Sequence, residues 1–373
     1  MGEPVLGIVA NPMSGRDIRR LVAKASVFPT AEKANMVQRI LTAAGTVGVE
    51  RVLLSTDVGG ISAAVLRALE AHQRSFRAGR DSVWPQVEFV ELPAHSQTAT
   101  DTTALVRLMI EAGARVIVCL GGDGTARVAA AACGEVPLLP LSTGTNNAFP
   151  QLREATVAGL AAALIATEEV DSQTGTRRAA TLLVDVGDRC ENALVDVAIA
   201  RTGDVGARAL WDPAALTELY VTFAEPDGIG LSSIPGLLSP SPRSEPTGVA
   251  LELCPPEAAT VVVRAPIAPG LVLPVGVRSW RRLEVGERVE VRTPAGTVAV
   301  DGEREIEFCT SSSASPATSA TASGSPPGTG GPGPPTVRLS ADGPLIVDIP
   351  AVMAQAARLG LLRLPVPTRR RTR

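Results

Sequence analysis

A glycine-rich turn that contains one aspartate, Gly121–Thr125 (GGDGT), is the strongest chemical signal in the sequence. It follows an apolar run, Arg115–Leu120, and precedes an alanine-rich stretch, Ala126–Cys133. Its glycines let the backbone adopt positive φ and approach a ligand closely, and the N–H groups at a helix start favour phosphate. A carboxylate beside phosphate is tolerated where it binds a cation or accepts a proton. Asp123 therefore indicates phosphoryl transfer assisted by Mg²⁺, or a general base for a hydroxyl nucleophile.

Three other interpretations of this turn exist. It could be a plain strand-to-helix turn with Asp123 as the N-cap residue. A Walker A loop requires a lysine at the helix start, and none is present. A dinucleotide fingerprint requires a third glycine where Arg127 stands, and residues 141–144 offer no acid for a ribose. The last two alternatives are disfavoured.

Two more polar loops follow apolar runs of strand type, at Asn11–Arg16 and Ser142–Asn147. Consecutive parallel strands place the loops at their carboxyl ends on one rim of a sheet. We therefore expect these loops to share a cleft with Asp123, although each could also be an ordinary turn. Together they predict a nucleotide site made of Asn11, Ser14, Gly121, Gly122, Gly124, Thr125, Thr143, Gly144, Thr145, Asn146 and Asn147.

An acidic segment late in the chain, Asp301–Glu305 (DGERE), has two interpretations. It could be a hairpin turn whose charges face solvent, or it could return Asp301 or Glu303 to the cleft, near a metal or the acceptor hydroxyl. The polar, glycine-rich connection Glu225–Ser233 could similarly line an acceptor pocket or form a surface loop.

The elements that must position these residues fall into two halves. Strand-like runs alternate with helical spacing over residues 1–175, which predicts an α/β domain with an open parallel sheet. One of these predicted helices covers residues 18–25. Short β-like runs over residues 176–309 predict a second, all-β domain. Residues 310–335, rich in Ser, Pro and Gly, read as a disordered linker. Residues 336–373 return to the core with a strand and a helix over Ala351–Leu361, and end in a basic tail.

Composition narrows the function classes. The chain has 373 residues, a net charge of −3 and a pI near 5.7, which disfavours a nucleic-acid binder. Its apolar runs are too short to span a membrane, and no signal peptide is evident. Five scattered cysteines without a CxxC motif argue against zinc ribbons and predict free thiols in a reducing cytoplasm.

These motifs together resemble the superfamily of NAD kinases and of diacylglycerol and sphingosine lipid kinases. The GGDGT turn, Asn11-Pro12 upstream, Gly144-Thr145-Asn146 downstream and a late Asp-Gly-Glu occur in the family's order. Residues 11–17, 229–236 and 299–307 are most similar to the ATP-NAD kinase-like branch that includes acetoin-catabolism protein X.

The resemblance implies an ATP- or polyphosphate-dependent kinase that uses Mg²⁺ and phosphorylates a hydroxyl, with NAD converted to NADP as the leading expectation. It makes Asp123 the proposed base, as in NAD kinases, and Glu303 a candidate base, as in lipid kinases. Of the family's adenine-binding pair only the acid is present, as Asp196, with Val195 in place of the asparagine. The alternatives are a lipid or small-polyol kinase, or a non-catalytic nucleotide sensor linked to acetoin catabolism. Relatives in this family also self-associate, which implies a homo-oligomer.

Overall fold

The computed structural model describes residues 2–15, 24, 28–77, 83–94, 96, 98–144, 146–201, 210, 212–310 and 333–364. Several predicted features lie outside this part of the chain. They are the helix over residues 18–25 except residue 24, the site residue Thr145, the basic tail, and residues 311–332 of the predicted linker.

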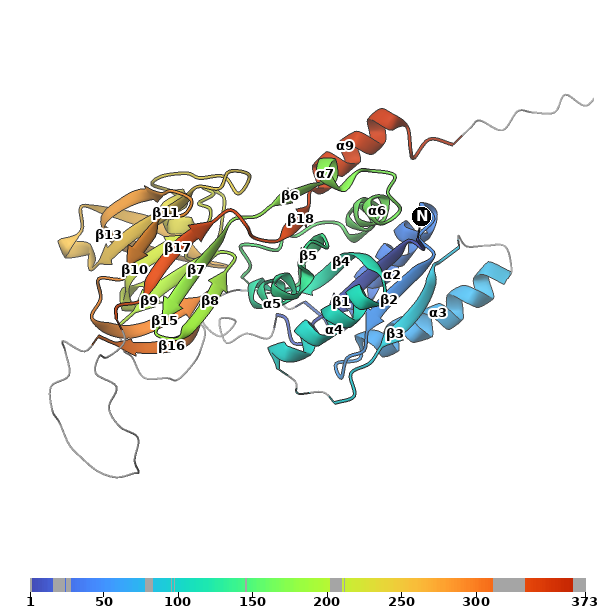
Figure 1. Ribbon diagram of the computed structural model, residues 1–373, viewed down its shortest axis with the longest axis horizontal. Coiled ribbons are helices and arrows are strands. Elements are labelled where there is room, and N and C mark those ends of the chain that lie inside the picture. The colour runs from blue at the N-terminus through green and yellow to red at the C-terminus, as the bar shows by residue number, and fades with distance from the viewer. Residues whose placement is uncertain are drawn as a thin grey trace, which may run out of the picture.

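The first half is built on a seven-stranded sheet, as its alternating pattern predicted (Figure 1). Five neighbouring strands are parallel, β18 continues the parallel direction beside β5, and β6 runs antiparallel to β18. The order across the sheet is β3 (Gln86–Val90), β2 (Arg51–Ser55), β1 (Val5–Ala10), β4 (Ala114–Gly121), β5 (Leu138–Ser142), β18 (Leu345–Val347) and β6 (Thr176–Arg178).

Helices cover both faces of this sheet because its central strands are apolar on both sides. Alternate residues of β1 point to opposite cores: Leu6 and Ile8 to one, Val5 and Val9 to the other. The first face carries α2 (Thr30–Thr46), α3 (Ile61–Arg77), α6 (Ala155–Ala166) and α9 (Ile349–Leu359), and the second carries α4 (Ala99–Glu111) and α5 (Asp123–Cys133). The terminal helix α9 packs on the first half through Val352 and Ala356, whereas Leu359 is exposed. A short helix, α7 (Ser172–Gly175), lies beside α9.

The second half consists of two antiparallel sheets, in agreement with its predicted β-rich character. The larger has the order β12 (Val261–Ala268), β13 (Leu271–Leu283), β11 (Gly248–Cys254), β10 (Leu216–Val221), β9 (Asp196–Ala200), β15 (Ala295–Val300) and β16 (Glu303–Cys309). The smaller has β14 (Arg288–Glu290), β17 (Thr336–Ser340), β7 (Thr181–Val186) and β8 (Arg189–Ala193). One apolar core lies between the sheets, and a second lies on the outer face of the larger sheet, where α8 (Ser233–Gly236) packs.

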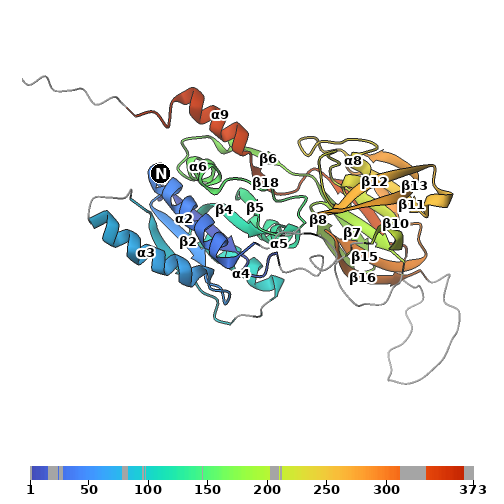
Figure 2. The same ribbon diagram turned by 180° about the vertical axis from the view of Figure 1, so that it is seen from behind.

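The chain crosses between the halves twice, and the two crossings lie side by side (Figures 1 and 2). One leads from β6 to β7 and the other from β17 to β18, so β6 belongs to the first sheet although it follows residue 175. The Ala179 N–H donates to the Pro344 carbonyl, and the Gly343 N–H donates to the Ala179 carbonyl. This double connection fixes the second half against the carboxyl edge of the first sheet.

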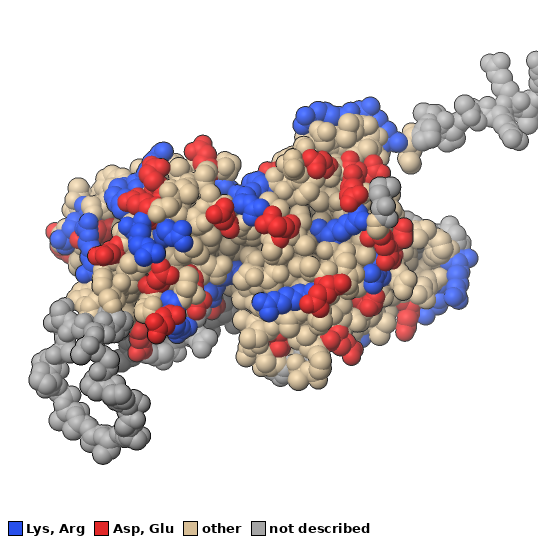
Figure 3. Space-filling view, in the orientation of Figure 1, with Lys and Arg blue, Asp and Glu red and all other residues tan. Residues whose placement is uncertain are grey.

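Charged side chains of both signs are interspersed over both halves on the face shown in Figure 3. None of the described helices is long and apolar enough to cross a membrane. The five cysteines, all within the described ranges, form no disulfide.

Candidate functional site

The GGDGT turn joins β4 to α5, and its first two glycines are required for close packing. Gly122 is the N-cap of α5, with φ −107° and ψ −172°, and Asp123 is the first helical residue. A Cβ on Gly121 would lie 2.5 Å from the Thr125 Cβ, and one on Gly122 would lie 2.9 Å from the Asn147 Oδ1. None of the three glycines has positive φ. Our expectation of positive φ in this turn was therefore wrong. Close approach explains Gly121 and Gly122, whereas a Cβ on Gly124 would meet no atom closer than 3.7 Å.

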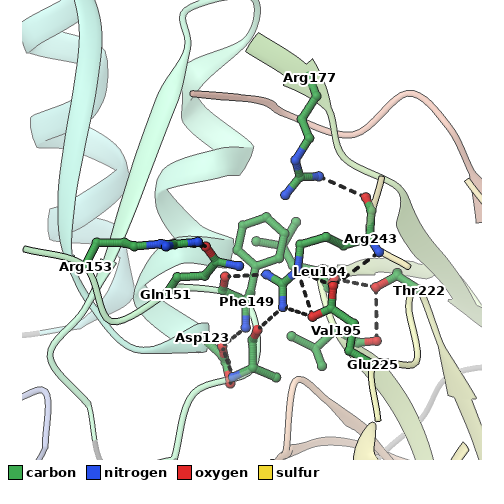
Figure 4. Close-up of polar contacts among 11 residues, drawn as sticks. Asp123, Phe149, Gln151, Arg153, Arg177, Leu194, Val195, Thr222, Glu225 and Arg243 are labelled. Carbon is green, nitrogen blue, oxygen red and sulfur yellow. Dashed lines mark hydrogen bonds and ion pairs between the residues drawn. The ribbon is translucent and has the colours of Figure 1, made fainter. Parts of the chain in front are cut away.

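The Asp123 carboxylate is held by the loop that follows β5. It accepts hydrogen bonds from the Ala148 N–H at 3.1 Å and the Phe149 N–H at 2.8 Å (Figure 4). The side chain therefore points toward the loop after β5, at Ala148 and Phe149. The N-cap interpretation is wrong, since Gly122 occupies that position.

The three predicted loops meet at one rim, as the parallel topology requires. The Asn11 N–H donates to the Leu120 carbonyl, and the Thr143 N–H donates to the Gly121 carbonyl, both at 2.9 Å. The strand order reverses between β1 and β4, and the rim lies at this topological switch point. Open α/β sheets bind ligands at such points.

Several predicted nucleotide contacts bind each other across this rim. The Asn11 Nδ2 donates to the Thr125 Oγ1 at 2.8 Å, and the hydroxyls of Ser14 and Thr143 share a hydrogen bond of 2.8 Å. Thr143 is fully buried, so its side chain supports the loop and offers a ligand nothing directly.

Asn147 and a buried lysine complete the support of the rim. The Asn147 Nδ2 donates to the Ser142 Oγ at 2.8 Å, and a Cβ on Gly144 would lie 2.5 Å from the Asn147 amide. The ammonium of Lys33 donates to the carbonyls of Asn11, Pro12 and Ser14 at 2.8–3.1 Å.

The Asp301 turn is at once a hairpin turn and part of the site. It connects β15 to β16, and Asp301 has φ +50°. Its carboxylate is buried and accepts hydrogen bonds from the N–H groups of Leu194, Val195 and Asp196 at 2.8–3.2 Å. The expectation that a hairpin would turn its charges to solvent was therefore wrong for Asp301.

The surroundings of Asp301 favour its protonated form. Burial raises the pKa of Asp301 to about 7, against the opposing effect of the Val195 N–H and the Arg127 guanidinium. The negative charge of Asp123 raises this pKa further. The Arg127 Nε lies 3.6 Å from the Asp301 Oδ2 and ties α5 to the second half.

A small cavity between the halves, of about 20 Å³, is lined by three aspartates, Asp123, Asp196 and Asp301. Residues from both halves line it: Asp123, Asn146, Ala148, Asp196, Leu210, Ile229, Gly230, Leu231, Ile267, Asp301 and Gly302. The Asn146 Nδ2 donates to the Ile267 carbonyl at 3.0 Å, and Asn146 Oδ1 has no hydrogen-bond partner among the described residues. Glu303 is not among the residues that line the cavity, and its Oε1 lies 3.7 Å from a Cβ built on Gly124.

Arg127 and Arg243, like Lys33, were not predicted as site residues. Arg127 stands one helical turn after Asp123, and that spacing was the available signal. Arg243 donates to the carbonyls of Ala148 and Phe149, and it gave no local sequence signal.

Comparisons with known proteins define the class of this chain. The model of the ATP-NAD kinase N-terminal domain matches residues 6–170, and that of the acetoin catabolism protein X C-terminal domain matches residues 180–320. A solved structure from Bacillus anthracis str. Sterne, provisionally assigned as a diacylglycerol kinase, aligns over 92% of this chain and 97% of its own, with 12% identity and a TM-score of 0.44.

Acetoin catabolism protein X of Cupriavidus necator is 44% identical over 310 residues, which are 82% of this chain and 85% of that protein. The chain therefore belongs to the acetoin catabolism protein X family, with an N-terminal domain of the ATP-NAD kinase type. The matched domain supports a kinase-type activity, that of a phosphotransferase.

Proposed function

We propose that this protein transfers a phosphoryl group from ATP or polyphosphate to a hydroxyl, with NAD as the leading acceptor and NADP as its product. The observation that carries the proposal is the position of Asp123. Its carboxylate stands at the start of α5 and opens on a cavity that the second half closes.

Each part of the site has a defined role in this proposal. The first turn of α5 leaves backbone N–H groups without intrahelical partners, and these suit the donor phosphates. The acceptor oxygen attacks the terminal phosphorus, a P–O bond forms, and the bond to the leaving phosphate oxygen breaks. The hydroxyl proton passes to the Asp123 carboxylate, which Ala148 and Phe149 hold in place.

The remaining cavity wall suits a ligand that carries both donors and apolar surface. Asn146 Oδ1 offers an acceptor to an O–H or N–H group. Leu210, Ile229, Leu231 and Ile267 give the wall an apolar side, which also favours an acceptor with an alkyl part. A lipid or a small polyol is therefore a second candidate acceptor.

Magnesium fits this site as an ion that the donor phosphates carry. No group of three or more His, Cys, Asp or Glu side chains that could hold a metal occurs in the part of the chain that the structure describes. Mg²⁺ commonly takes one or two carboxylates and completes its octahedron with phosphates and water. Asp123 and Asp196 are the carboxylates that would face it, and the ion would neutralise charge on the transferred group.

A non-catalytic nucleotide sensor in acetoin catabolism is the other candidate, because the relative's name gives a catabolic process and no kinase activity.

The free cysteine thiols suit a cytoplasmic location, where ATP is available.

The test is NADP formation by the purified protein with NAD, Mg²⁺ and either ATP or polyphosphate. We expect NADP to accumulate with one of these donors, and a lipid and polyol panel follows if it does not. Thermal stabilisation by nucleotide without turnover of any acceptor would favour the sensor. A protein that neither binds nucleotide nor turns over an acceptor would refute the proposal.

A further inference from the structure

Glu225 and Arg243 close the base of a long segment in the second half. Beside them, Ala224 and Ser241 form an antiparallel bridge, with N···O distances of 2.7 and 2.9 Å. The segment between them, residues 225–240, supplies Ile229, Gly230 and Leu231 to the wall of the cavity that contains Asp123.

The guanidinium of Arg243 contacts both a carboxylate and an aromatic ring. It pairs with the Glu225 carboxylate, with its Nε 2.9 Å from Oε1, and its guanidinium carbon lies 4.4 Å from the centre of the Phe223 ring. Burial alone would raise the pKa of Glu225, but the hydrogen bonds and charge of Arg243 outweigh it and hold this pKa below its ordinary value. The pair is therefore a charged, largely buried fork in a fixed orientation.

The same fork reaches across to the first half. The Arg243 Nη1 donates to the Phe149 carbonyl and Nη2 donates to the Ala148 carbonyl, each at 3.1 Å (Figure 4). The N–H groups of these same two residues donate to Asp123. Two residues thus carry a continuous chain of hydrogen bonds from Glu225 through Arg243 to the Asp123 carboxylate.

We propose that Arg243 is a positioning residue. Through the backbone of Ala148 and Phe149, it fixes the position of the Asp123 carboxylate relative to the 225–240 segment. This inference rests on the proposed function, since an acceptor in the cavity would meet Asp123 and Ile229–Leu231 together. A guanidinium is required, because Arg243 donates to four oxygens, the two carbonyls and both oxygens of Glu225, whereas a lysine ammonium has only three N–H groups.

The test is a double-mutant cycle of Arg243→Lys and Asp123→Asn, measured with NAD and Mg-ATP. Arg243→Lys should lower kcat about tenfold or more, because small misplacement of a catalytic group is costly, while the KM for ATP changes less than about twofold. In the Asp123→Asn background the same change should alter the residual rate by less than about twofold. Equal losses in both backgrounds, or an unchanged kcat in Arg243→Lys, would overturn the proposal.

Arg115→Lys is the matched control. Arg115 also donates to two carbonyls, those of Gly2 and Ala166, and pairs with Glu168 at 2.9 Å, but it lies outside the cavity lining. Its kcat and KM should equal those of the wild type.

A second readout does not depend on turnover. Hydrogen exchange of the Ala148 and Phe149 amides should accelerate in Arg243→Lys and in Asp123→Asn, and should remain at the wild-type rate in Arg115→Lys. If the wild type phosphorylates no acceptor while these exchange changes occur, the proposed function fails and the positioning link stands. Unchanged exchange at both amides in Arg243→Lys removes the link, whatever the activity.

Discussion

The buried carboxyl group of Asp301 should make the stability of this protein depend on pH in a distinctive direction. Its pKa is about 7 in the folded protein, against about 3.9 for an unperturbed aspartate. Between these values the native state binds more protons than the unfolded state, so stability falls as pH rises. The contribution is fully present below about pH 4 and is lost as pH passes through 7.

The size of this effect follows from the two pKa values. Between pH 5 and pH 8 the free energy of unfolding should fall by about 2–3 kcal/mol, because about two pH units of this range lie below the native pKa. Asp301→Asn removes this titration. The new amide group would face the Leu194 N–H, whose present acceptor is Oδ2, at a cost of about 1–3 kcal/mol. That cost is the same at every pH, so it shifts the stability profile without changing its slope.

Urea unfolding of both proteins at pH 5, 6, 7 and 8 measures this difference. We expect the wild type to lose stability relative to Asp301→Asn with rising pH, most steeply between pH 5 and 6, and hardly at all beyond pH 8. Parallel profiles over the whole range would show that Asp301 is ionised throughout, and would refute the assignment of a protonated group at this position.

The rim and the core give three further predictions. Lys33→Met removes a donor from three carbonyls and should cost about 3 kcal/mol, read as a lower melting temperature; an unchanged value contradicts this role. Gly121→Ala should lower the melting temperature, because its Cβ would lie 2.5 Å from a side chain. Gly124→Ala should fold normally and bind ATP more weakly. Equal stability of the two variants would be inconsistent with this packing. Burial raises the pKa of the Cys119 and Cys133 thiols to about 12, so iodoacetamide at pH 8 should spare them in the folded protein. The exposed Cys190 and Cys309 should be modified first. The reverse order, measured by mass spectrometry, would contradict the fold.

The sequence predicted the fold class and the rim of the first half because both depend on local patterns. Apolar runs such as Arg115–Leu120 mark strands buried on both faces, and the loops after parallel strands must share one edge. Helix α2 is absent from the elements predicted above, although Met36, Val37, Ile40 and Leu41 have the spacing of a buried helical face.

Contacts between distant segments could not be read from the sequence. Arg243 binds residues 94 and 95 positions away, and its own surroundings are a Pro- and Ser-rich loop without periodicity. Lys33 is fully buried, although a lysine in an amphipathic helix is expected on the polar face. Asp301 was recognised as a turn residue, but its burial depends on three N–H groups more than 100 positions earlier.

The rate of phosphoryl transfer by Asp123→Asn tests the central claim most directly. The substitution keeps one oxygen for the N–H groups of Ala148 and Phe149, and it removes the group that accepts the hydroxyl proton. We predict a loss of about 10²–10⁴-fold in kcat with the donor that the wild type uses, while ATP or polyphosphate binds with unchanged affinity. A variant whose kcat stays within about twofold of the wild type would contradict the account, because the carboxylate at the centre of the cavity would then have no part in the reaction.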